Sequence, residues 1–194
     1  MHPLIDSIAR KPSEKFTRPN FSVRRYDIID EAKKIFKATC LSTVPYANMV
    51  MLATQDSVLL VGLLAGVPSY NVPMRRRDGL VSYPNEVNLP RATFSISEAT
   101  QAFMTKGFFT FTVTGTLLDA HSVGAAHCSF LVTKLKGICR NSTSNDPTAF
   151  LDQSTSFMAD NSFACAMVRL GNIQVPTGNA KEIRRNCRIF NKPK

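Results

Sequence analysis

The stretch FTFTVTGTL, residues 109–117, decides the fold that this sequence predicts. Its side chains alternate with a period of two, which places Phe109, Phe111, Val113 and Leu117 on one face and four threonines on the other. Such alternation is typical of a strand that buries one face and exposes the other. The stretch therefore predicts a sheet with one apolar face.

A helix is predicted directly after this strand. Apolar residues from Val123 to Leu135 recur at a spacing of three and four, which places them, together with His127, on one side of a helix. Ser122 is a suitable N-cap, and Gly137 can adopt the left-handed turn that ends a helix. Strand and helix together describe a core, but they carry no catalytic motif.

The flanking segments add further predicted strands and helices. Strands are expected over residues 92–97, 163–170 and 172–175, and helices over residues 27–39, 98–105, 147–153 and 179–190. Residues 45–66 favour two short helices, although periodicity leaves buried strands open. The predicted fold class is a single α+β domain with a small, mostly antiparallel sheet, packed helices and basic N- and C-terminal extremities.

Composition is typical of one soluble domain. The 194 residues are 44% hydrophobic, enough to bury a core without disulfides or metals. The start of the sequence shows no secretory signal, and the longest apolar run, residues 58–67, is too short for a membrane span. Five cysteines at irregular spacing argue against a disulfide framework. We therefore expect an intracellular protein, located in the cytoplasm or in a virion.

The net charge of +10 is concentrated at the two ends. Residues 1–25 carry six basic and two acidic groups, and residues 181–194 carry six basic groups and one acidic group. Residues 26–180 are nearly neutral, with twelve basic and eleven acidic groups. The expected organisation is a basic, proline-containing arm (1–25), a globular body (26–180) and a basic C-terminal segment (181–194). Because cations that neutralise phosphates release counterions, such ends are expected to bind a polyanion. A surplus of charge that serves solubility is the alternative.

The predicted nucleic-acid interface consists of basic side chains in the arm, in a proline-marked loop and in the C-terminal segment. Phe16 and Phe21 can stack on bases or pack the arm against the body. The arginine triplet of the loop has Asp78 as the only acid close in sequence. The predicted binding residues are Lys11, Lys15, Arg18, Arg24, Arg25, Arg75, Arg76, Arg77, Lys181, Arg184, Arg185, Arg188, Lys192 and Lys194.

The sequence contains little that indicates a catalytic site. No phosphate-binding loop, dinucleotide-binding turn or nucleophile elbow is present, so no cofactor is expected. His121, His127, Cys128 and Cys139 are the only cluster worth testing for zinc, and helical spacing turns them away from one another. We expect no metal and no catalytic residue.

The function predicted from the sequence is non-enzymatic. A self-associating body with basic ends is typical of viral coat, nucleocapsid and matrix proteins, so the expected partners are nucleic acid, with RNA favoured, copies of the same chain and, for a matrix-type protein, an anionic membrane surface. One alternative is a monomeric RNA-binding regulator or transport factor. Another is an enzyme that uses the region of His121, Asp119 and the cysteines.

Overall fold

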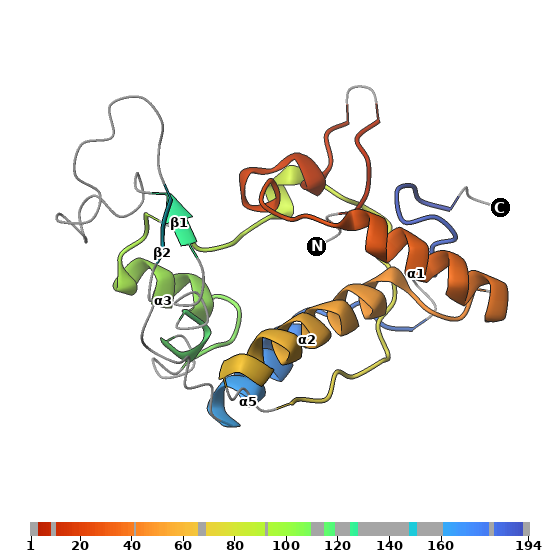
Figure 1. Cartoon of the computed structure of the whole chain (residues 1–194). Helices are drawn as coiled ribbons and strands as arrows, with labels where there is room; N and C mark the ends of the chain where they lie inside the picture. The colour runs from red at the N-terminus through yellow and green to blue at the C-terminus, as the bar shows by residue number, and fades with distance from the viewer. Residues whose placement is uncertain are drawn as a thin grey trace. The chain divides into compact units, whose positions relative to one another are not determined.

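The computed structural model of the chain contains mainly helices (Figure 1). It describes residues 4–8, 11–40, 42–65, 69–91, 93–109, 115–118, 125–127, 148–150, 161–178 and 181–191. The helices are α1 (Tyr26–Thr39), α2 (Tyr46–Ala65), α3 (Ile96–Met104) and α5 (Asn161–Gly171). The short 3-10 helices are η1 (Glu14–Phe16), η2 (Arg18–Asn20) and η3 (Pro84–Glu86), and the strands are β1 (Ala125–His127) and β2 (Thr148–Phe150).

The chain divides into two compact units. The first unit comprises Met1–Val58, Tyr70–Leu89 and Val168–Lys194, and the second comprises Leu59–Ser69 and Pro90–Met167. The first unit contains both ends of the chain, and most of the contacts described below lie within it.

Helix α1 confirms the helix predicted over residues 27–39. Ile29 and Ala32 pack against the core of the first unit, as expected from their helical spacing. Ile28 and Ile35, seven residues apart, are exposed on another side of the helix. The helix therefore buries only part of its apolar surface within the described structure.

Helix α2 is one continuous helix where two short helices were expected. The polar residues 55–57, interpreted as an interruption, lie inside it. The Gln55 side chain donates to the Tyr70 carbonyl, and Ser57 Oγ donates to the Ala53 carbonyl at 2.7 Å. Because these side chains find acceptors on the helix or beside it, their polarity does not end the helix.

The core of the first unit joins the two ends of the chain to α2. Its fully buried members are Leu4, Tyr46, Met49 and Cys187. The backbone N–H of Asp6 donates to the carbonyl of Arg188 at 2.9 Å, so the N- and C-terminal segments lie side by side. Residues 13–20 form η1 and η2, and the buried Glu14 donates its backbone N–H to Ser82 Oγ at 3.1 Å.

In the second unit, α3 begins with a capping box. Ser95 Oγ accepts a hydrogen bond from the backbone N–H of Glu98 at 3.3 Å, and the Glu98 carboxylate accepts one from the backbone N–H of Ser95 at 2.7 Å. The helix buries Ala99 and Phe103, and the Phe103 and Phe108 rings meet edge to face with centroids 5.8 Å apart.

The prediction of an α+β domain built on a mostly antiparallel sheet is wrong. The described residues contain one two-stranded antiparallel ladder, in which Ala126 pairs with Ala149. Residues 115–118, the end of the expected central strand, form a helical turn, and residues 110–114 lie outside the described part. Strand β1 falls where a helix was expected over residues 122–136, and β2 falls where one was expected over residues 147–153.

Four further predictions fail. A short apolar run such as residues 163–170 fits a strand and a helix equally well. Residues 172–174, part of the strand expected over residues 172–175, form a turn. Residues 163–170 belong to α5, where the buried Phe163, Ala164 and Ala166 follow helical spacing. Residues 92–97, expected as a strand, contain the N-cap of α3, and the described part of residues 179–190 forms bends and a bridge rather than a helix. The helix expected over residues 98–105 is confirmed by α3.

Within the part of the chain that the structure describes, none of the helices combines the length and apolar character needed to cross a membrane.

Candidate functional site

Asp78 connects three segments of the first unit through its buried carboxylate. It accepts hydrogen bonds from the backbone N–H groups of Tyr46 and Ala47, at 3.2 and 2.9 Å, and from that of Arg184 at 2.9 Å. Tyr46 and Ala47 form the first turn of α2, where the helix leaves N–H groups without partners and presents the positive end of its dipole. Asp78 thus caps α2 from a distant part of the sequence.

Arg184 balances the charge of Asp78. Its side chain is 1% exposed, and Nη2 lies 3.6 Å from Asp78 Oδ1. Nη1 donates to the Cys187 carbonyl at 3.1 Å, and the guanidinium lies 5.5 Å from the centroid of the Tyr46 ring. Backbone hydrogen bonds of 2.9 and 3.2 Å between Asp78 and Glu182 hold the two segments together. The C-terminal segment is therefore fixed to α2 by a buried ion pair.

A second ion cluster connects the C-terminal segment to α1. Arg188 forms an ion pair with Asp30, with Nε at 3.2 Å from Oδ2, and lies 4.0 Å from Asp6. The buried Cys187 thiol donates to Asp30. Burial raises the pKa of this thiol to about 11, and the neighbouring carboxylate of Asp30 adds to the shift. The thiol is therefore protonated near neutral pH and is a poor nucleophile.

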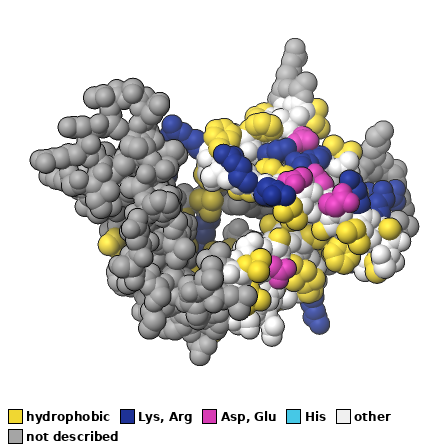
Figure 2. Space-filling model, viewed as in Figure 1, with side chains coloured by type: hydrophobic (Ala, Val, Ile, Leu, Met, Phe, Trp, Pro, Cys, Tyr) yellow, Lys and Arg dark blue, Asp and Glu magenta, His cyan; other side chains and the backbone are white. Residues whose placement is uncertain are grey.

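Residues of the N-terminal segment also take part in this ion cluster. Lys15 forms an ion pair with Asp6, and its ammonium lies 5.4 Å from the centroid of the Tyr26 ring. Arg188 lies at the same distance from that ring. On the face of the first unit that Figure 2 shows, basic side chains lie beside acidic ones.

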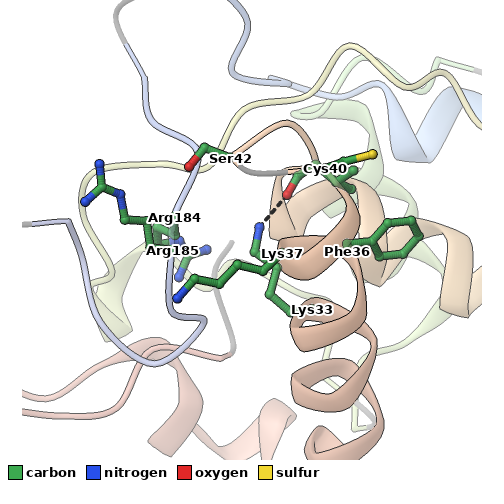
Figure 3. A pocket seen from close by; sticks show the side chains of 8 residues that line it. Lys33, Phe36, Lys37, Cys40, Ser42, Arg184 and Arg185 are labelled. Carbon is green, nitrogen blue, oxygen red and sulfur yellow. Dashed lines mark hydrogen bonds between the residues drawn. The ribbon is translucent and has the colours of Figure 1, made fainter.

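A pocket of about 280 Å³ opens between the end of α1 and the C-terminal segment. It is lined by Lys33, Phe36, Lys37, Cys40, Ser42, Val44, Arg184 and Arg185. In Figure 3 the lysines face the arginines, whereas the ring of Phe36 points away from them. Four of the eight lining residues are cations and none is an acid. This pocket was not predicted from the sequence.

Lys33 is a buried cation of this pocket with partners of its own. Its side chain is buried, donates to the Val44 carbonyl and lies with its ammonium 4.5 Å from the centroid of the Tyr46 ring. Burial lowers the pKa of Lys33, the positive charges of Arg184 and Lys37 lower it further, and Asp78 opposes the shift.

The structure places the residues predicted to bind nucleic acid in different environments. Arg184 is buried, and Arg188 and Lys15 pair with carboxylates of the same unit. Arg76 is buried and donates to the Gly171 carbonyl at 2.7 Å. The exposed members are Lys11, Arg18, Arg24, Arg25, Arg75, Lys181 and Arg185, Arg77 is half-buried, and Lys192 and Lys194 lie outside the described residues.

The histidine and cysteine region considered for an enzyme lies mostly outside the described residues. His121, Asp119, Cys128 and Cys139 belong to that part of the chain, and His127 is described only through the backbone of β1. Among the described residues, no three His, Cys, Asp or Glu side chains come together to hold a metal ion.

Comparison with known proteins reveals relatives along nearly the whole chain. A family model described as peroxidase matches residues 4–169. Peroxidase 44 of Arabidopsis thaliana is 41% identical over 240 residues, which cover 97% of this chain and 76% of the relative. Peroxidase 57 of Arabidopsis thaliana and Peroxidase 5 of Vitis vinifera are 38% and 30% identical, with the same two coverages.

These matches overturn the function predicted from the sequence. A non-enzymatic, RNA-binding, self-assembling protein of the viral capsid, nucleocapsid or matrix type is wrong, because the relatives are peroxidases. The expected partners, nucleic acid first, are wrong for the same reason, since peroxidases act on small molecules such as hydrogen peroxide. The prediction counted charges along the sequence, whereas the described structure pairs three of the terminal cations, Lys15, Arg184 and Arg188, with carboxylates of the same unit.

Proposed function

This chain belongs to the plant class III peroxidase family, and we propose that it is an oxidoreductase that reduces hydrogen peroxide with electrons from a small-molecule donor. The observation that carries the proposal is the 41% identity to Peroxidase 44 across 97% of this chain. The family fold is mostly helical, in agreement with α1, α2, α3 and α5.

The family implies a haem, whose iron is held by a histidine in peroxidases. The chain has three histidines. His2 and His121 lie outside the described residues, and His127 is described through the backbone of β1. The described side chains therefore include no histidine, and no catalytic step is assigned to a haem.

We propose His121 as the histidine to test first. Asp119 lies two residues before it, and a carboxylate of this kind commonly accepts the second N–H of a metal-bound imidazole and fixes its orientation. His127 lies in β1 and His2 lies among the first residues, and neither has an acidic residue two positions away.

The alignment also shows that this chain lacks residues that its relative has. It runs over 240 positions of Peroxidase 44, whereas 97% of 194 residues amounts to about 188. About 50 positions inside the aligned region therefore have no counterpart in this chain. The match to Peroxidase 66 covers 71% of the chain over 138 residues, which is almost free of such gaps.

The test is expression of the full 194-residue chain in the presence of haem. We expect a haem absorbance band in the purified protein and oxidation of a chromogenic phenol that depends on hydrogen peroxide. Oxidation should stop when hydrogen peroxide is left out. A chain that folds but neither retains haem nor oxidises the phenol would refute the proposed function.

Histidine variants test the proposal that His121 binds the haem iron separately from the proposed function. His121→Ala should lose both the haem band and the activity, whereas His2→Ala and His127→Ala, the matched controls, should keep them. If His121→Ala retains both while another variant loses them, the assignment of His121 is wrong and the proposed function stands.

A further inference from the structure

The pocket between α1 and the C-terminal segment has no role in the chemistry described above. We propose that it binds a small oxyanion, a phosphate or a carboxylate. The proposal concerns the first unit alone and stands independently of peroxide reduction.

The first argument is the sign of the charge around the pocket. Lys33, Lys37, Arg184 and Arg185 line it, without a carboxylate among the lining residues. Asp78 neutralises Arg184, which leaves the positive charge of the other three without an equal counter-charge. The carbonyl end of α1 contributes about half a negative charge, which is too small to balance them. An oxyanion supplies the charge that the pocket lacks.

The second argument is that two of the cations are held in place before any ligand binds. Lys33 is fixed by the Val44 carbonyl and the Tyr46 ring, and Arg184 by Asp78 and the Cys187 carbonyl. Their conformational entropy is therefore already lost in the folded chain, so an anion does not have to order them. Burial also weakens the competition from water for these groups.

The third argument is that the other two cations are available. The side chains of Lys37 and Arg185 are exposed and form no ion pair with any described residue. The backbone N–H of Arg185 donates to Asn191 Oδ1 at 3.0 Å, which fixes the start of the side chain at the pocket rim. Arginine offers a planar pair of donors that matches the two oxygens of a phosphate or carboxylate.

The size of the pocket limits the ligand. At about 280 Å³ it lies just below the range of sites for drug-sized molecules, roughly 300–1,000 Å³. Because the Phe36 ring points away from the arginines, the polar side of the pocket offers no aromatic wall to an organic group (Figure 3). A compact ion fits these properties better than a nucleotide.

The test is calorimetric titration of the full chain with inorganic phosphate and, separately, with citrate, at concentrations up to about 10 mM. Sodium chloride at equal ionic strength is the control for screening. We expect saturable binding of phosphate, of citrate or of both, and the comparison shows whether the pocket prefers phosphate or carboxylate. Absence of saturable binding for both ions would refute the proposal.

Paired variants locate the site. The double variant K37Q/R185Q should weaken binding by on the order of tenfold for each cation removed, because hydrogen bonds between charged groups are strong. The matched control K34Q/R75Q removes the same net charge from exposed positions outside the pocket and should leave the affinity unchanged. Equal weakening in the two double variants would indicate a general effect of net charge and would overturn the site. The titration of the unmodified chain remains decisive if a variant fails to fold.

Discussion

Asp78 offers the sharpest test of the first unit, because one carboxylate holds three segments together. Asp78→Asn keeps the size of the side chain, removes its charge and replaces one acceptor oxygen with an amide that cannot accept from a backbone N–H. The substitution leaves Arg184, which is 1% exposed, as a buried charge without the carboxylate of Asp78 beside it. It also weakens the cap on the first turn of α2.

The expected cost follows from these losses. Breaking a buried ion pair by removing one partner typically costs about 3–5 kcal/mol, because the remaining charge stays buried. Such a loss is a large share of the roughly 5–15 kcal/mol by which a domain is stable. Arg184→Gln should cost less than Asp78→Asn, since Asp78 keeps its three backbone N–H donors when Arg184 is removed. The two costs together should exceed that of the double variant, because the pair is broken only once.

Urea unfolding followed by far-ultraviolet circular dichroism is the suitable assay. The chain contains no tryptophan, so fluorescence offers a weak signal, whereas α1 and α2 dominate the dichroism of the first unit. Asp56→Asn is the matched control, because Asp56 is exposed on α2, and its stability should stay within about 0.5 kcal/mol of the unmodified chain. An Asp78→Asn variant within about 1 kcal/mol of the unmodified chain would refute the assignment of Asp78 as the anchor.

Three other predictions concern single groups. Arg76→Met should cost about 1–3 kcal/mol of stability, because it leaves the Gly171 carbonyl without its buried donor, whereas Arg75→Met, at the exposed neighbouring position, should be nearly neutral in the same urea assay. Ser95→Ala should cost about 1 kcal/mol by removing the N-cap of α3, and an equal effect of Ser97→Ala, the exposed control in the first turn, would show that the cap is not the cause. Because the pKa of the Cys187 thiol is raised from 9.0 to about 11, the stability it contributes is complete below pH 9 and is lost between pH 9 and 11, by at most about 1.4 kcal/mol per pH unit. In Cys187→Ala, the free energy of unfolding measured in urea should depend less on pH between pH 9 and 11. An unchanged dependence on pH would contradict the role of this thiol.

The helices of the first unit could be predicted from the sequence where one face is clearly apolar. In α1, Ile29 and Ala32 repeat at helical spacing and acidic and basic residues occupy the appropriate ends, so pattern and dipole agree. The alternating stretch 109–117 predicted a strand, but residues 115–118 are helical and residues 110–114 lie outside the described part. At residues 115–118 the local pattern was outweighed by the surrounding fold.

The contacts of the candidate site could not be predicted, since its partners are far apart in sequence. Asp78 and Arg184 are 106 residues apart, and Asp30 and Arg188 are 158 apart. One signal was present in the sequence: Asp78 is the single acid beside three arginines. It was considered only as a neighbour of the triplet, whereas the structure shows that it caps α2 and pairs with the C-terminal segment.

The same contacts show that net charge counted along the sequence does not give the charge that stays available in the folded chain. An excess of lysine and arginine attracts a polyanion only if the cations remain exposed and unpaired after folding. Asp6, Asp30 and Asp78 bind cations from both ends of the chain, and these pairs fold the ends onto the first unit. What remains available in the pocket is the charge of Lys37 and Arg185 beside the buried Lys33, an arrangement sized for one small anion rather than for a nucleic acid. The relevant quantity is therefore the local charge left unpaired in the folded chain, and the phosphate titration measures its effect directly.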